Sequence, residues 1–129
     1  MKSTFLAGLA AGLLAVSGAQ AQPSGLTRTD LQRHDLSIPG REAIQVRVDF
    51  APGAVAGAHT HYGEEIIYVL GGTLEYQLAD QPPVTLKAGG VLFVPTGVVH
   101  RARNVGTGPA SELATYVVEK GKPLVTLAR

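Results

Sequence analysis

The sequence predicts an all-β protein built as an antiparallel β-barrel or sandwich. Short segments in which apolar residues alternate with polar ones recur along residues 41–129, and turns rich in Gly and Pro separate them at close spacing. No segment has the periodicity of an amphipathic helix of useful length. A jelly roll is one standard architecture for such a pattern, because it limits the exposed strand edges that would pair with other chains.

The expected strands follow one another with short connections. Ile44, Val46 and Val48 alternate with polar neighbours, which gives this strand one apolar and one solvated face. The same reasoning predicts strands at 43–50, 65–70, 73–78, 84–87, 91–94, 99–105, 112–119 and 124–127. Turn residues lie between them, as expected hairpin connections at 71–72 and 81–83 and as tight links at 88–90 and 95–97.

The N-terminus has the pattern of a cleaved secretory signal. Lys2 precedes an apolar and small-residue stretch from 5 to 16, and an Ala-Gln-Ala ending follows. The stretch is shorter than the roughly 20 apolar residues of a transmembrane helix, so an uncleaved anchor is the weaker alternative. We expect residues 1–21 to be a signal peptide cleaved after Ala21, and the mature protein to be periplasmic or secreted. Residues 22–40 are expected to form an arm or edge strand, and residues 41–129 the barrel domain.

The composition argues against two classes of partner. Eleven Lys and Arg residues stand against ten Asp and Glu residues, and loss of the leader removes Lys2, which leaves the mature chain formally neutral. Without a basic cluster, neither nucleic acid nor a membrane surface is an expected partner. Cysteine is absent from the sequence, so neither disulfides nor thiolate metal ligands contribute.

Three of the four histidines lie in two short segments bounded by glycine, and this concentration is the main functional signal. His59 and His61 are two residues apart in a stretch expected to be extended, so both imidazoles project to one face about 7 Å apart. Glu65 shares its face of the next strand with Ile67 and Val69. A carboxylate among apolar side chains needs a partner, and a cation supplies one.

The second glycine-bounded segment contributes His100. Pro95 and Gly97 shape a turn, after which the chain restarts as a strand. His100 then faces the interior, whereas Arg101 and Arg103 face solvent. A lone inward histidine is usually a satisfied core residue, but here the inward faces of two separate segments both carry metal-binding groups.

Both segments match the motifs of the cupin superfamily. The first fits G-x5-H-x-H-x3-E-x6-G over residues 53–72, and the second fits G-x5-P-x-G-x2-H-x3-N over residues 89–104. The chain therefore resembles small single-domain cupins, which implies a double-stranded β-helix, the cupin jelly roll. The resemblance also implies metal ligation by the family's three His and one Glu, here His59, His61, Glu65 and His100. Glu64 is an alternative to Glu65, because the spacing varies slightly within the family.

Such a ligand set implies one divalent transition metal as cofactor. Imidazole and carboxylate ligands suit Fe, Mn, Ni, Cu, Co or Zn, and the residues do not choose among them. Four protein ligands leave positions on the metal for a substrate. Because the histidines must be deprotonated to bind, we expect metal loss below about pH 6.5.

The barrel interior is expected to be apolar around the metal. Its predicted lining is Val46, Val48, Ile67, Val69 and Phe93. Polar tips could come from Tyr62, Tyr76 and Tyr116, although an ordinary packed or surface aromatic is the favoured interpretation of each. Exposed or solvated positions are expected for His34, Arg47 and Glu64.

The resemblance favours a metal-dependent oxidoreductase of dioxygenase type, similar to quercetin dioxygenase-like cupins, acting on a small organic substrate that chelates through oxygen. A metal-dependent lyase, isomerase or decarboxylase is one alternative, with Glu65 as a proton shuttle and Tyr62 as a further catalytic candidate. A non-catalytic metal or ligand-binding module is another. The resemblance also implies a homodimer, formed through exchange of the arm near residues 26–38.

Overall fold

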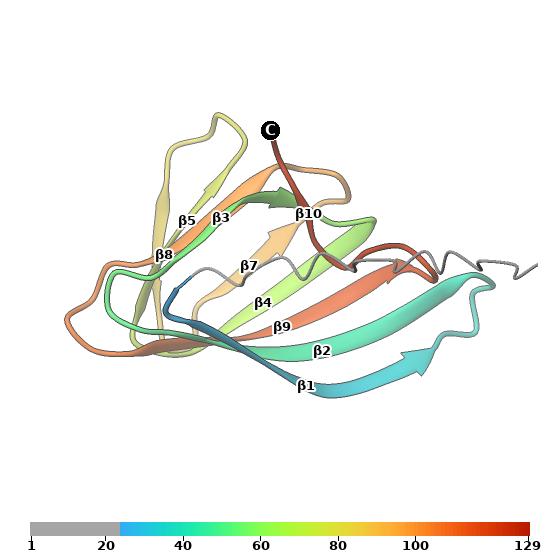
Figure 1. Ribbon diagram of the computed structural model, residues 1–129, viewed down its shortest axis with the longest axis horizontal. Helices are drawn as coiled ribbons and strands as arrows, with labels where there is room; N and C mark the ends of the chain where they lie inside the picture. The colour runs from blue at the N-terminus through green and yellow to red at the C-terminus, as the bar shows by residue number, and fades with distance from the viewer. Residues whose placement is uncertain (1–23) are drawn as a thin grey trace, which may run out of the picture.

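The computed structural model describes residues 24–129, which form ten strands in two antiparallel sheets. In chain order the strands are β1 (Leu26–Asp35), β2 (Arg41–Phe50), β3 (Val55–Thr60), β4 (Gly63–Gly71), β5 (Thr73–Leu78), β6 (Val84–Lys87), β7 (Val91–Val94), β8 (His100–Asn104), β9 (Ala110–Glu119) and β10 (Thr126–Leu127). The first sheet has the order β1-β2-β9-β4-β7, and the second has the order β10-β3-β8-β5-β6. Figure 1 shows the two sheets facing each other, with β1 at the outer edge of the lower one. The predicted all-β antiparallel fold is confirmed.

The space between the sheets is filled by the inward faces of the strands, which form one apolar core. Val46, Val48, Ile67 and Val69 lie in it, as the alternation of apolar and polar residues predicted. The prediction for Phe93 was wrong, because this side chain is 56% exposed. Residues 91–94 are apolar without interruption, so the sequence carries no alternation that would show which face points inward.

Two strands have weak sequence signals. In the segment expected to be an arm or edge strand, β1 is an edge strand that pairs with β2 of the same chain from Leu26 to Asp35. The strand β3 was expected only as an extended stretch. A register shift between Ala56 and His59 interrupts its pairing with β8, and Gly57 lies within the shift. Such a bulge breaks the period of two that reveals a strand in a sequence.

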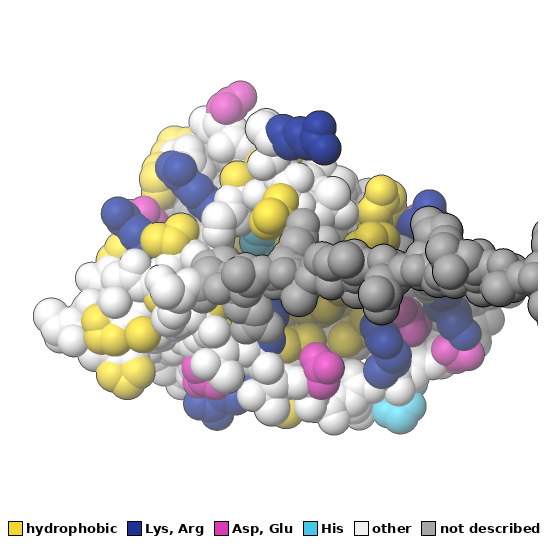
Figure 2. Space-filling model, in the orientation of Figure 1, with side chains coloured by type: hydrophobic (Ala, Val, Ile, Leu, Met, Phe, Trp, Pro, Cys, Tyr) yellow, Lys and Arg dark blue, Asp and Glu magenta, His cyan; other side chains and the backbone are white. Residues whose placement is uncertain are grey.

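The segment from 1 to 23 lies outside the described residues, and the predicted signal peptide falls within it. Among residues 24–129, no helix is long and apolar enough to cross a membrane. On the face drawn in Figure 2, basic and acidic side chains are interspersed.

The side chain of Asn104 connects β8 to two neighbouring loops. It is buried, and the two N–H groups of its Nδ2 are shared among the carbonyl oxygens of Phe50, Ala51 and Gly108, which all lie within hydrogen-bond distance. Its Oδ1 accepts a hydrogen bond from the backbone N–H of Gly106. This last residue of the second motif therefore has a structural role in holding the loops beside β8.

Replacing Asn104 by alanine is expected to lower the free energy of unfolding by about 2 kcal/mol, because buried backbone groups lose their partners. Urea unfolding of the metal-free protein measures this change. Replacement of its exposed neighbour Arg103 by alanine is the matched control. Equal midpoints for Asn104→Ala and the wild type would show that these hydrogen bonds do not stabilise the fold.

Candidate metal centre

The four side chains singled out by the motifs meet in the space between the two sheets. His59 on β3 and His100 on β8 are directly paired in the second sheet, and Glu65 comes from β4 of the first. His61 lies in the short connection between β3 and β4. One ligand atom from each of the four lies within 4.8 Å of the others, and all four side chains are buried. Donor atoms on opposite sides of one ion lie about 4.2 Å apart, so this spacing is close to that of a metal site.

Each histidine ring is oriented by a backbone carbonyl. The Nδ1 atoms of His59, His61 and His100 lie in hydrogen-bond contact with the carbonyl oxygens of Gly57, Leu124 and Val98, respectively. A carbonyl oxygen only accepts, so Nδ1 carries a proton in all three rings, and Nε2 is the nitrogen whose lone pair a metal can use once it holds no proton. This is the arrangement found around metal-bound histidines.

The Nε2 atom of His61 supports the fit of a cation. It is buried and has no hydrogen-bond partner among residues 24–129, although it lies 3.2 Å from Oε2 of Glu65. The Nε2 of His100 lies 2.9 Å from the same oxygen. A buried nitrogen without a partner is costly, and a metal ion shared with Glu65 would satisfy it.

The electrostatics of the cluster favour the ionisation states that a metal requires. Burial lowers the pKa of His59 to about 4, which keeps this imidazole neutral at physiological pH. Burial alone would raise the pKa of Glu65, but the neighbouring His100 and His61 outweigh it and lower that pKa, so the carboxylate is ionised. Burial lowers the pKa of His100, but its hydrogen bond to Glu65 outweighs this and raises the pKa overall. A bound cation would replace the proton that His100 shares with Glu65.

Gly63 allows the backbone of β4 to approach β9 closely beside the cluster. It has a positive φ of 157°, and a Cβ atom there would lie 2.0 Å from the carbonyl oxygen of Val117. The glycine thus lets β4 begin two residues after His61 and two before Glu65. On β9, Tyr116 is opposite Glu65, and its ring centroid is 4.8 Å from that of His61.

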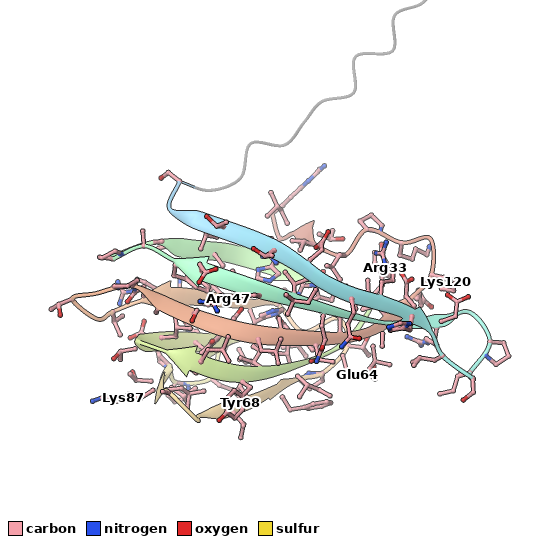
Figure 3. All side chains as sticks on the ribbon, turned by 90° about the horizontal axis from the view of Figure 1, so that it is seen from below. Arg33, Arg47, Glu64, Tyr68, Lys87 and Lys120 are labelled. Carbon is pink, nitrogen blue, oxygen red and sulfur yellow. The ribbon has the colours of Figure 1, made fainter. Side chains whose placement is uncertain are left out.

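The structure separates the remaining candidates. Glu64 is half-buried on the outer face of β4, so Glu65 and not Glu64 belongs to the cluster. Arg47 and His34 are exposed, as predicted. Figure 3 shows Arg47 and Glu64 among the side chains of the first sheet's outer surface, with Tyr68 further along β4.

Of the three candidate tyrosines, Tyr76 and Tyr116 are buried and Tyr62 is not. The Tyr62 side chain is 43% exposed, and Nζ of Lys122 lies 5.2 Å from its ring centroid. It lines a pocket of about 320 Å³ that also includes His61. Tyr62 therefore lies beside the cluster on its outer side and not in the barrel interior.

A second buried carboxyl group was not anticipated. Glu112 on β9 is 5% exposed and accepts a hydrogen bond from the hydroxyl of Tyr76. Burial, followed by the charge of Glu65, raises the pKa of Glu112 to about 7. The sequence does contain a signal for it, since Glu112 has the same parity as the inward Ala114 and Tyr116. Because Leu113 on the other face is apolar, polar and apolar residues do not alternate regularly around Glu112, and the inward face was not evident.

The fold and the cluster together define a double-stranded β-helix with a buried site of three histidines and one glutamate. A family model described as the cupin domain matches residues 46–116, which is just over half of the chain. The chain belongs to the cupin family.

Plant germin-like proteins are among its relatives. The chain is 38% identical to germin-like protein subfamily 2 member 2 of Arabidopsis thaliana over 61% of this chain and 40% of that protein. It is 37% identical to germin-like protein 1-1 of Oryza sativa subsp. japonica over 72% of this chain and 45% of that protein. The chain thus spans less than half the length of these curated relatives.

Solved structures with the same fold include enzymes. Oxalate oxidase in complex with the substrate analogue glycolate has a TM-score of 0.66 and 25% identity, over 83% of this chain and 57% of that one. The DMSP lyase DddQ from Ruegeria pomeroyi DSS-3 has a TM-score of 0.61 and 26% identity, over 67% of this chain and 43% of that one. A double-stranded β-helix protein from Klebsiella pneumoniae has a TM-score of 0.68 and 21% identity, over 85% and 90%.

Proposed function

We propose that this protein is a metal-dependent oxidoreductase that uses oxygen to convert a small organic substrate able to chelate a metal through its oxygen atoms. The observation that carries the proposal is the buried cluster of three oriented imidazoles and one carboxylate. His59, His61, Glu65 and His100 would hold one divalent transition metal. The likeness to oxalate oxidase supports oxygen chemistry at a site of this kind.

The chain's own residues have separable tasks in this proposal. The carbonyl oxygens of Gly57, Leu124 and Val98 orient the three rings before any metal binds, which lowers the cost of assembling the site. The apolar interior excludes water from the reacting groups. Glu65 has two oxygen atoms, so one can accept a proton while the other serves as a ligand. When bound, the metal would act as a Lewis acid that polarises the substrate and brings it together with oxygen.

The test combines metal content with oxygen uptake. The full chain is purified from the exported fraction of its producing cells, its metal is identified by mass spectrometry, and oxygen uptake is followed with oxalate, glycolate, a flavonol and a diketone. Uptake that depends on both the bound metal and one of these compounds supports the proposal. Zinc as the sole metal, or no uptake with a redox-active metal bound, would contradict it.

A second candidate, a metal-dependent lyase, is favoured by the likeness to the DMSP lyase. Such an enzyme would use the same four residues, with Glu65 or the nearby Tyr62 moving a proton. The two candidates differ in their need for oxygen. Cleavage of DMSP or another small organic acid in anaerobic buffer would identify the lyase and reject the oxidoreductase.

Two further proposals concern the context of the site. We propose that residues 1–21 direct export and are removed after Ala21, which N-terminal sequencing of the exported protein would check. We also propose a homodimer, for which the measured mass in solution is the test. Exchange of the arm would place β1 of one copy on β2 of the other, in place of the β1–β2 pairing within one chain that the described residues form.

A further inference from the structure

One row of positions crosses the first sheet on its inner face. Arg28 on β1 is paired with Val48 on β2, Val48 with Glu112 on β9, and Glu112 with Val69 on β4. Directly opposite residues of antiparallel strands project to the same face. Val48, Glu112 and Val69 are all buried. Arg28 therefore projects into the barrel, although it belongs to an edge strand.

The guanidinium of Arg28 is incompletely satisfied there. Its Nη1 atom is buried and has no hydrogen-bond partner among residues 24–129. The ion pairs formed within this part of the chain do not include Arg28. An arginine is permanently charged and carries five donors, so a buried donor left without an acceptor is costly. Such a position calls for an oxyanion.

The surroundings of Arg28 connect it to the metal centre. The pairing of Arg28 with Val48 and of Val48 with Glu112 places the guanidinium on the same face as Glu112, and the Arg28 side chain also forms a hydrogen bond with Tyr116 that leaves Nη1 without a partner. Tyr116 in turn packs its ring against His61 and is paired with Glu65. An anion held by Arg28 would thus lie on the side of the cluster that faces β1 and β9.

A pocket lies beside this position, along the edge strand β1. This pocket of about 320 Å³ is lined by residues 30–33 of β1 together with Ile44 and Leu124. Leu124 is the residue whose carbonyl oxygen accepts the hydrogen bond from His61. The pocket therefore begins two residues beyond Arg28 on β1 and ends against a residue that contacts the metal centre.

We propose that Arg28 is a substrate-binding residue that receives a carboxylate of the substrate, at a position separate from the oxygen atoms that approach the metal. This inference rests on the proposed function, because it assigns the substrate class of the same site: small organic acids with a second oxygen-bearing group. A planar guanidinium pairs with a carboxylate through two parallel hydrogen bonds. Glu112 offers little competition as an internal anion, since it is partly protonated at neutral pH and bound by Tyr76.

The test compares two hydroxamates of nearly equal size by calorimetric titration of the full chain loaded with zinc. Both have the same metal-chelating hydroxamate at one end of a two-carbon chain, and the other end is a carboxylate in N-hydroxysuccinamate and a neutral amide in N-hydroxysuccinamide. Zinc is redox-inert, so binding is measured without turnover. The wild type is expected to bind the carboxylate ligand about 10- to 100-fold more tightly than the amide ligand, as a charge-assisted pair with Arg28 implies. The Arg28→Met variant is expected to lose this preference while it keeps its metal. Arg28→Lys keeps the positive charge but not the two parallel N–H donors of the guanidinium, so it should retain part of the preference.

The matched control is Arg47→Met, which removes an exposed arginine from the adjacent strand and should bind both ligands as the wild type does. An undiminished preference in Arg28→Met, or no preference in the wild type, would overturn the inference. Its failure is distinguishable from failure of the proposed function. If the proposed oxidoreductase function fails, oxygen uptake is absent with every substrate, but the wild type still prefers the carboxylate ligand and Arg28→Met still loses that preference.

Discussion

Replacing His100 by alanine is expected to weaken metal binding by more than about 100-fold, so that the variant keeps almost no metal after dialysis. The change deletes one of four ligands. Removal of only a residue that hydrogen-bonds to a ligand already lowers metal affinity by about 10- to 100-fold. His100 is also one of the two ligands that the second sheet contributes, on β8 and directly paired with His59 on β3. Metal content after loading and exhaustive dialysis, measured by mass spectrometry, is the readout.

The same substitution has an effect that does not depend on metal. In the metal-free protein His100 provides the hydrogen bond that helps to keep the buried Glu65 ionised. Its removal leaves a buried carboxylate with one neighbour fewer, and we expect a loss of about 3 kcal/mol in the free energy of unfolding. His34→Ala, an exposed histidine on β1, is the control for both measurements. Stoichiometric metal in His100→Ala would refute the assignment of the cluster.

The metal cluster could be predicted from the sequence because its evidence is local. His59 and His61 lie two residues apart, and Glu65 and His100 each sit on strands whose alternation shows the inward face. The spacing of the two motifs then relates the segments to each other. To predict that the four side chains meet in space, only the family motifs were needed in addition to these local signals.

The second polar group of the interior could not be predicted in this way. Arg28 lies in a segment of β1 with weak alternation, and its inward direction follows only from its pairing with Val48. Glu112 shares the parity of the inward Ala114 and Tyr116, but only the position of β9 between β2 and β4 shows that this face is fully buried. Pairing partners on distant segments decide such positions, and a single sequence does not contain them. The failure at Phe93 has the same origin, since only pairing of β7 with β4 shows its face.

The buried Glu112 is expected to lower the free energy of unfolding at neutral pH, and Glu112→Gln is expected to restore it. We expect the variant to be more stable than the wild type by about 3 kcal/mol at about pH 8, and the difference to shrink toward about pH 4. Glutamine keeps an acceptor for the hydroxyl of Tyr76 and carries no charge to desolvate. Urea unfolding of both metal-free proteins across this pH range measures the difference.

The sign of this effect follows from the proton balance. Burial, then the charge of Glu65, raises the pKa of Glu112 from 4.5 to about 7, so between these pH values the folded state holds a proton that the unfolded state has released. The stability contributed by this proton is fully present below about pH 4.5 and is lost as the pH rises through about 7.

His59 acts in the opposite direction, because burial lowers its pKa to about 4 and so makes stability rise with pH over part of the same interval. That contribution is common to the wild type and to Glu112→Gln, and it cancels in their difference. Tyr76→Phe provides a second check. Loss of the Tyr76 hydroxyl removes a hydrogen bond that lowers the pKa of Glu112, so the fall in stability should extend to higher pH. A difference in stability between the wild type and Glu112→Gln that stays constant from about pH 4 to about pH 8 would contradict this prediction. It would show that Glu112 has the same pKa in the folded and unfolded states.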